Sequence, residues 1–265
     1  MNIRKYHLIL KDDLGRFKKS ELTNEDVDFY IKHINIINEL RYLNFLSVNY
    51  KSIQKQFNEF CAKTNYDEIE TYSIIFNSIN AFYTNIEFWK KYLNKYKNNK
   101  NIFKNNKSIL EIKDSELYDT SYEYMVVKAL RNYAQHKGVP FTHISQNKLF
   151  LEIKVLLNDK KINQKAKQIL MKHQKEIFID LLPTINKAFL VLDELNDYIY
   201  KSIVGLINLD INLACEKLGN LIDENYIGGA IVWVNEELPD DDYYKVEYID
   251  IPFYYIRYLK NNNLI

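Results

Sequence analysis

The clearest helical pattern in the chain lies at Tyr122–Pro140, YEYMVVKALRNYAQHKGVP. Its apolar residues recur three or four positions apart, the spacing of one buried stripe on a helix. They are Tyr122, Met125, Val126, Ala129, Leu130 and Tyr133. Glycine just past a helix and proline shortly after it are a common stop signal, so the helix should stop at Gly138, ahead of Pro140. His136 is then expected in its last turn.

Helical spacing extends to both sides of this stretch. Apolar stripes run from Val27 to Leu40, where Thr23 and Asp26 give a capping signal, and from Tyr72 to Leu93. A further helical pattern begins near Gln164, is interrupted near Pro183 and continues to about Ile222. Three more segments complete this part of the chain: a short strand at Tyr6–Leu10 before a turn at Gly15, a solvated loop at Lys97–Lys107, and Lys148–Leu157 as a strand or a short helix.

The composition of the sequence changes after Gly228 and Gly229. Ala230–Val234 and Tyr244–Tyr258 are rich in β-branched and aromatic residues, and an acidic turn at residues 239–242 separates them. This pattern predicts a small β hairpin or sheet. The fold class is therefore expected to be mainly α, a helical bundle (residues 1–225) with a small C-terminal β elaboration of the same domain (residues 226–265).

Composition narrows the classes of function. The chain has 265 residues, 47% of them hydrophobic, which is typical of a folded globular protein. Its 36 basic and 35 acidic side chains nearly cancel, and a protein that coats long stretches of nucleic acid is usually more basic. Cys61 and Cys215 have no metal-like spacing, and neither a signal peptide nor a membrane-length apolar run is seen. We therefore expect a cytoplasmic protein without membrane contact.

Four polar residues near the end of the Tyr122 helix have the chemistry to act on a phosphodiester. Arg131 and Gln135 are one turn apart, as are Asn132 and His136, so they should form one patch. A guanidinium offers a planar fork of donors to phosphate oxygens, and an imidazole can accept and return a proton near neutral pH. Asn132 would orient the site. RNA supplies its own nucleophile, the 2′-hydroxyl, so neither a metal nor another cofactor is expected.

The pattern of Arg131, Asn132 and His136, an arginine followed by a polar residue and a histidine after four intervening positions, resembles the active motif of HEPN ribonucleases. The longer string Leu130–Pro140 also looks like a HEPN-like group of bacterial proteins. The resemblance covers about eleven residues and the surrounding helical layout. It implies a helical bundle, a homodimer with two motifs facing each other, and metal-independent RNA cleavage in toxin–antitoxin or phage-defence (abortive infection) systems.

On this reading Arg131, Asn132 and His136 are catalytic, and Gln135, Tyr133 and Lys137 contact the RNA substrate. A cognate antitoxin or a defence effector is a further expected partner. Some HEPN toxins carry a modifiable tyrosine two residues after the histidine, where this chain has Gly138, so neutralisation by modification there is not expected.

Two other interpretations of this segment stand beside the nuclease. One is a non-catalytic, HEPN-like dimeric interaction module that regulates a defence system. The other is purely structural, with His136 capping the helix end and Arg131 a solvated charge. His143 and His173 are isolated, and residues 240–242 are interpreted as a solvated acidic turn rather than a calcium loop.

Overall fold

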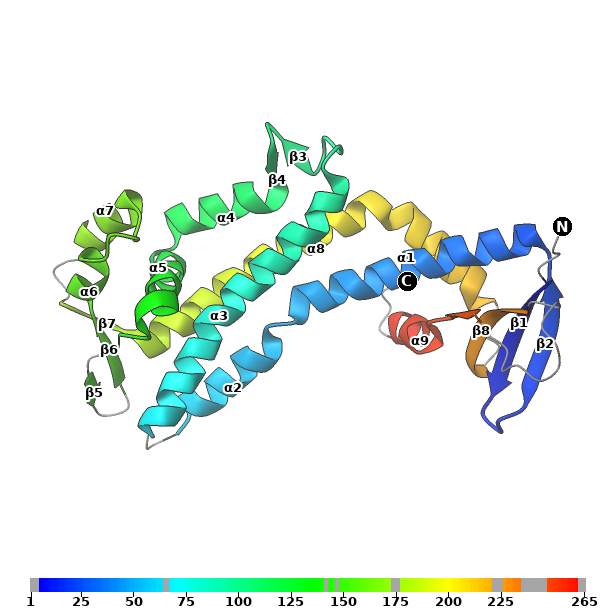
Figure 1. Cartoon of the computed structure of the whole chain (residues 1–265), viewed down its shortest axis with the longest axis horizontal. Helices are drawn as coiled ribbons and strands as arrows, with labels where there is room; N and C mark the ends of the chain where they lie inside the picture. The colour runs from blue at the N-terminus through cyan, green and yellow to red at the C-terminus, as the bar shows by residue number, and fades with distance from the viewer. Residues whose placement is uncertain are drawn as a thin grey trace. The chain divides into compact units, whose positions relative to one another are not determined.

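The residues with the clearest helical pattern form helix α5 (Tyr122–Lys137) in the computed structural model of the chain (Figure 1). The structure describes residues 5–63, 67–140, 143–145, 148–172, 177–220, 226–234 and 247–261. The predicted stop of the helix is confirmed. Gly138 has a φ of 80°, which a residue with a side chain rarely adopts, and its N–H donates to the Ala134 carbonyl at 3.0 Å.

The chain divides into two compact units. Phe45–Ile203 forms one, here called the helical unit, and Met1–Asn44 with Val204–Ile265 forms the other, here called the sheet unit. The predicted boundary between residues 225 and 226 coincides with neither break. The long helices α1 (Asn24–Val48) and α8 (Leu181–Gly219) each belong partly to both units.

The helical unit consists mainly of helices, with short strands between them. Besides the end of α1, α5 and the first part of α8, its elements are α2 (Lys51–Cys61), α3 (Glu68–Leu93), the 3-10 helix η1 (Asn94–Tyr96), β3 (Phe103–Lys104), β4 (Lys107–Ser108), α4 (Ile109–Thr120), β5 (His143–Ser145), β6 (Lys148–Glu152), α6 (Ile153–Leu157), α7 (Gln164–Lys172) and β7 (Phe178–Asp180).

Side-chain caps fix where its principal helices begin. Asp67 accepts from the Glu70 N–H at the start of α3, and Ser121 accepts from the Tyr124 N–H at the start of α5. Ser108 and Glu111 form a reciprocal capping box on α4. Each cap satisfies backbone donors that the first turn of a helix leaves unpaired, typically worth about 1 kcal/mol. Local sequence therefore sets the residues at which α3, α4 and α5 begin.

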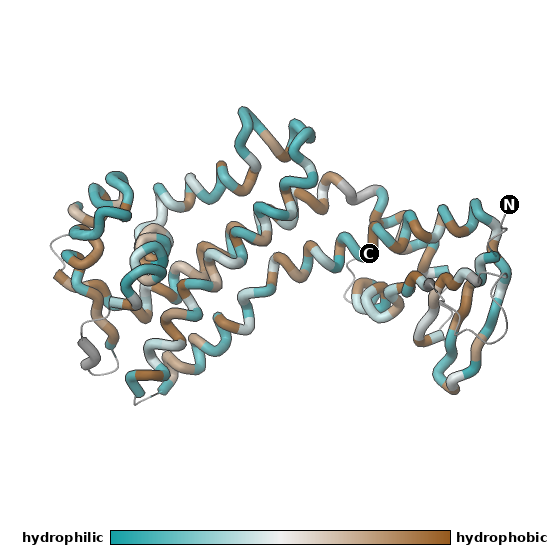
Figure 2. Tube along the Cα trace, in the orientation of Figure 1, coloured by the Kyte–Doolittle hydropathy of each residue, from teal (hydrophilic) through white to brown (hydrophobic). Residues whose placement is uncertain are grey.

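A buried chain of amides joins α3 to α8 and to the end of α1. The Trp89 indole N–H donates to the Asn196 side-chain oxygen at 2.6 Å, and the Asn196 amide donates to Asn85 at 3.0 Å. The Asn85 amide in turn donates to the Leu46 carbonyl at 2.8 Å. Around this chain the helices are amphipathic, and hydrophobic and hydrophilic residues alternate within each turn of α3 (Figure 2). The network fixes one register between helices that apolar packing alone would leave less specific.

The sheet unit is built on one antiparallel sheet in the order β2-β1-β8-β9. The β1 residues Leu8 and Leu10 and the β8 residue Ile231 are buried on one face. A Cβ on Gly229 would lie 2.8 Å from Leu10 Cδ2 and 2.9 Å from the Phe253 ring, so close packing requires glycine there. The elements of this unit, besides its parts of α1 and α8, are β1 (Lys5–Asp12), β2 (Phe17–Leu22), β8 (Tyr226–Val234), β9 (Glu247–Asp250) and α9 (Phe253–Asn261).

The expected strand at Tyr244–Tyr258 was wrong in part. It is not extended throughout, because Phe253–Asn261 forms helix α9, whose Phe253, Ile256 and Leu259 are buried at a three- to four-residue spacing. The predicted interruption near Pro183 is confirmed, because the strand β7 lies between α7 and α8, and α8 begins at Leu181. Pro183 itself lies in the first turn of α8, where proline is tolerated because its missing N–H would have no partner.

The segment Lys97–Lys107, expected as a solvated loop, contains the short strand β3 and the buried Ile102, and the expected acidic turn at residues 239–242 lies outside the described residues. Several other local expectations agree with the structure. The fold is mainly α, the Tyr6–Leu10 strand is part of β1, and Lys148–Leu157 contains both a strand and a short helix. Thr23 and Asp26 cap α1 through reciprocal hydrogen bonds of 2.9 and 3.1 Å. In the part of the chain that the structure describes, no helix combines the length and apolarity needed to cross a membrane.

Candidate functional site at the end of helix α5

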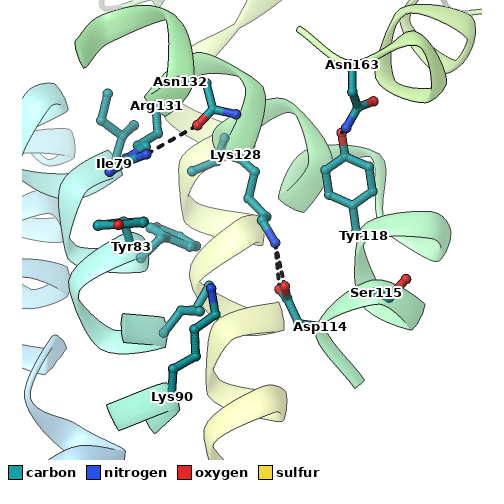
Figure 3. Close-up of a pocket in the computed structure, with 13 residues that line it drawn as sticks. Ile79, Tyr83, Lys90, Asp114, Ser115, Tyr118, Lys128, Arg131, Asn132 and Asn163 are labelled. Atoms are coloured by element: carbon teal, nitrogen blue, oxygen red, sulfur yellow. Dashed lines mark hydrogen bonds and ion pairs between the residues drawn. The ribbon is translucent and has the colours of Figure 1, made fainter. Parts of the chain in front are cut away.

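Arg131 and Asn132 lie together at the rim of a pocket of about 370 Å³ in the helical unit (Figure 3). The Arg131 Nη1 donates to the Asn132 side-chain oxygen at 3.3 Å, a long hydrogen bond between neighbours on α5. Lys128, one turn earlier, lines the same pocket. Positions i, i+3 and i+4 share one face of a helix, so α5 directs two cations and an amide toward one cavity.

The guanidinium of Arg131 lies over the Tyr83 ring of α3, with Cζ 3.5 Å from the ring centroid. This is a close cation–π contact, and it holds the planar group in one orientation. The Arg131 Nε is buried and has no hydrogen-bond partner among the described residues. A buried donor left unpaired costs free energy, so the Arg131 side chain is held against Tyr83 at some cost.

Three helices provide the charged lining of the pocket. α3 contributes Lys90, α4 contributes Asp114, and α5 contributes Lys128 and Arg131. Three cations and one carboxylate leave a formal charge of +2. The chain as a whole has a net charge of only +1, so positive charge is concentrated at this cavity. Such a lining favours an anionic ligand.

Asp114 is the centre of a polar cluster on one wall. Lys128 donates to both of its oxygens, at 2.8 and 2.7 Å, and the Tyr124 hydroxyl donates to one of them at 2.7 Å (Figure 3 draws the lysine contacts). Burial, followed by the nearby Asp114 carboxylate, raises the pKa of Tyr124 well above 10.0. Tyr124 therefore remains a neutral hydrogen-bond donor at physiological pH. The cluster fixes the Lys128 ammonium at the pocket.

The opposite wall and floor are apolar or aromatic. Tyr83, 41% exposed, presents its ring beside the opening, and Ile79 lies next to it (Figure 3). On the same side of the pocket as Asp114, Tyr118 of α4 accepts a hydrogen bond from the Asn163 amide at 3.1 Å (Figure 3). Burial raises the pKa of the Tyr118 hydroxyl. The pocket thus combines cations with flat apolar surface.

His136 lies outside this pocket. It is exposed in the last turn of α5, five positions beyond Arg131 and four beyond Asn132. At about 100° per residue, five positions correspond to a rotation of about 140° past one full turn. Arg131 and His136 therefore leave the helix on different sides, and within one chain the structure brings together Arg131 and Asn132 but not His136.

The residues expected to contact substrate have different surroundings. Gln135 is exposed, and Tyr133 is half-buried beneath the Lys137 ammonium, which lies 5.0 Å from its ring centroid. Lys137 also pairs with Asp159 at 3.6 Å. The backbone N–H of Lys161 is the main cause of the lowered pKa of Asp159, and Lys137 contributes to it. Lys137 thus joins the end of α5 to the segment between α6 and α7.

Sequence reasoning missed Tyr83, Lys90, Asp114 and Lys128 as parts of a site. Lys128 had a usable signal, because it precedes Arg131 by three positions and so shares its face. Tyr83 lies in the apolar stripe from Tyr72 to Leu93, and nothing in that stripe marks it as part of a site. Asp114 and Lys90 become neighbours of Arg131 only through packing between helices, and no local pattern carries that information.

The structure adds no support for a site at the remaining histidines, the acidic segment or the cysteines. His173 and residues 240–242 lie outside the described residues, as does the side chain of His143. Across the described ranges, no group of three His, Cys, Asp or Glu side chains is placed to hold a metal ion. Both cysteines are free, with Cys215 buried and Cys61 half-buried. No known protein family, curated protein or solved structure matches the chain.

Proposed function

We propose that this chain is a metal-independent RNA endonuclease that acts at the end of α5, in the cytoplasm, as part of a bacterial toxin–antitoxin or phage-defence system. The observation that carries the proposal is the Arg131 guanidinium, held on the Tyr83 ring with a buried, unpaired Nε, on the same helix as the exposed His136, five residues further on. Charge is concentrated there in an otherwise nearly neutral chain. The resemblance of Arg131, Asn132 and His136 to the active motif of HEPN ribonucleases supports RNA cleavage as the reaction.

The reaction needs one proton to be removed and one to be supplied. The RNA 2′-hydroxyl attacks the adjacent phosphorus while His136 accepts its proton, and the bond from phosphorus to the 5′-oxygen breaks. The leaving 5′-oxygen takes a proton from the His136 of a second copy or from water. The products are a 2′,3′-cyclic phosphate and a 5′-hydroxyl. Arg131 stabilises the charge that develops on the phosphate oxygens, and Asn132 orients the group.

The test compares RNA cleavage by wild type, His136→Ala and His7→Gln, all in EDTA. His7 lies on β1 in the sheet unit, so its variant is a matched loss of an imidazole away from α5. All three proteins are checked for equal thermal stability and equal oligomeric state. We expect cleavage, with cyclic phosphate ends, by wild type and His7→Gln only. Equal activity of His136→Ala, or no cleavage of any RNA, would refute the nuclease.

One observation favours the second candidate, a non-catalytic dimeric interaction module. His136 is exposed and lies outside the pocket, so its own chain gives it no place beside Arg131. In that case the exposed turn containing Gln135 and His136 would contact a second copy or an effector protein. Retention of dimers together with an absence of RNA cleavage would select this alternative.

A further inference from the structure

The pocket beside Arg131 is larger and more varied in its lining than a site for a phosphate group alone would need to be. Its volume of about 370 Å³ lies at the lower end of the range of small-molecule sites, roughly 300–1,000 Å³. It combines the ammonium groups of Lys90 and Lys128 with the aromatic ring of Tyr83 and an apolar floor. Cations suit a phosphate, and flat apolar surface suits a planar ring system. A nucleotide has both parts.

Hydrogen-bonding groups are present where the edge of such a ring would lie. The Asn163 amide and the Tyr118 hydroxyl face the cavity opposite Arg131 (Figure 3). Each can donate and accept. The guanidinium of Arg131 at the rim offers a planar cation to a phosphate oxygen.

We propose that this pocket binds one unstacked nucleotide of a single-stranded RNA, next to the phosphodiester that is cleaved. The choice of RNA as the source of the nucleotide rests on the proposed nuclease function. Asn132 lines the pocket and lies four residues, about 6 Å along the axis of α5, before His136, so one RNA strand spans the pocket and the end of the helix. A base inside a duplex cannot enter such a cavity without being unpaired, so the pocket selects single strands.

The test measures equilibrium binding of a fluorescent, 2′-O-methyl single-stranded oligonucleotide, which lacks the nucleophile and cannot be cleaved. Lys90→Gln removes a pocket cation whose partner in the structure is Glu87, an i,i−3 contact at 3.0 Å. Lys91→Gln is the matched control, because Lys91 is the next residue on α3, exposed and outside the pocket. Both variants are first checked by thermal unfolding.

We expect Lys90→Gln to weaken binding about fivefold and to lower the slope of log affinity against log salt by about 0.7, the value for one lost phosphate contact on a single strand. Lys91→Gln should stay within about twofold of wild type, as for a lysine that contacts no phosphate. Tyr83→Leu should weaken binding at least as much as Lys90→Gln, because base stacking and the support of Arg131 are both lost. The duplex of the same sequence should bind at least tenfold more weakly, since its base must be unpaired.

Four results would overturn the proposal: equal effects of Lys90→Gln and Lys91→Gln, no effect of Tyr83→Leu, equal binding of duplex, or binding of free adenosine monophosphate without RNA binding. The two proposals fail in different ways. If oligonucleotide binding depends on Lys90 and Tyr83 but no His136-dependent cleavage is found, the nuclease proposal is refuted and the pocket proposal stands. If the protein cleaves RNA but the substitutions at Lys90 and Tyr83 do not change binding, the pocket proposal alone is refuted.

Discussion

Replacing Asp114 with asparagine should lower stability and raise RNA affinity together. The substitution removes the only carboxylate among the residues that line the pocket while keeping a side-chain oxygen for the buried Tyr124 hydroxyl. Lys128 loses the partner that it contacts at 2.7 and 2.8 Å. Few single changes in the chain are expected to move these two quantities in opposite directions.

The size of each effect follows from the geometry. Side-chain exposures of 27% for Lys128 and 18% for Asp114 place the pair between a surface and a buried ion pair. Its loss should cost about 1–2 kcal/mol, more than an exposed pair and less than a fully buried one. A ligand phosphate about 7 Å from the former carboxylate would gain about 0.6 kcal/mol at a dielectric constant of 80 and about 2.4 at 20, or roughly 3- to 50-fold in affinity.

Urea unfolding measures the first effect, and anisotropy with the 2′-O-methyl oligonucleotide at two salt concentrations measures the second. Tyr124→Phe is the control, because it removes the hydroxyl contact with Asp114 at a cost of about 1 kcal/mol and leaves the charge of the pocket unchanged. Its RNA affinity should equal that of wild type. If Asp114→Asn bound RNA no more tightly than Tyr124→Phe at low salt, the pocket would not be the place where the phosphate binds.

Three further predictions concern the scaffold of the site. Asn196→Leu leaves the Trp89 indole N–H and the Asn85 oxygen buried and unpaired, so the free energy of unfolding should fall by about 2–4 kcal/mol, measured by urea unfolding against the exposed control Lys201→Ala. The pKa of Asp159 lies below its ordinary 3.8 in the folded chain, so its stabilisation is complete above that value and lost as pH falls through the folded pKa. Asp159→Asn should therefore show a shallower loss of stability than wild type between about pH 5 and 3, and equal slopes would contradict this. Burial raises the pKa of Cys61 and of Cys215 to about 11, so both thiols should react slowly with a disulfide reagent at pH 8 and rapidly in denaturant.

Local sequence signals predicted most of the helices because their causes are local. The apolar stripe ending at Tyr133, the glycine stop at Gly138 and the capping pair of Thr23 and Asp26 all appear in the structure. α9 was misread because aromatic residues favour strands on average, while the burial of Phe253, Ile256 and Leu259 follows a helical spacing. The pairing of β1 with β8 joins residues more than 200 positions apart, and short-range periodicity contains no information about it.

The candidate site was predicted only in part, for a similar reason. The sequence alone predicts that Arg131, Asn132 and His136 lie near the end of one helix. The expectation of one patch treated these side chains as independent of their neighbours, whereas the Tyr83 ring draws the Arg131 guanidinium toward α3. Aromatic residues at helical spacing usually form core, so nothing in the stripe distinguished Tyr83 from the buried Phe82 beside it.

The separation of Arg131 from His136 has a consequence for the proposed chemistry. The two side chains leave α5 about 140° apart, so a phosphate held by the arginine of one chain is not presented to the histidine of that chain. In a dimer formed through the end of α5, the Arg131 of one copy would have to lie opposite the His136 of the other, and a two-fold axis would then repeat this pairing at a second site. The proposed nuclease therefore requires two chains for each complete site.

Mixing two inactive variants tests this requirement. In a dimer of one Arg131→Ala chain and one His136→Ala chain, a site shared between copies is intact once, since the wild-type arginine and the wild-type histidine lie on different chains. Random pairing gives such dimers half of the time, so the mixture should recover about a quarter of wild-type cleavage. Each variant alone should remain inactive after the same exchange procedure. If subunit exchange is demonstrated and the mixture stays inactive, arginine and histidine do not act across copies, and the composite site is wrong.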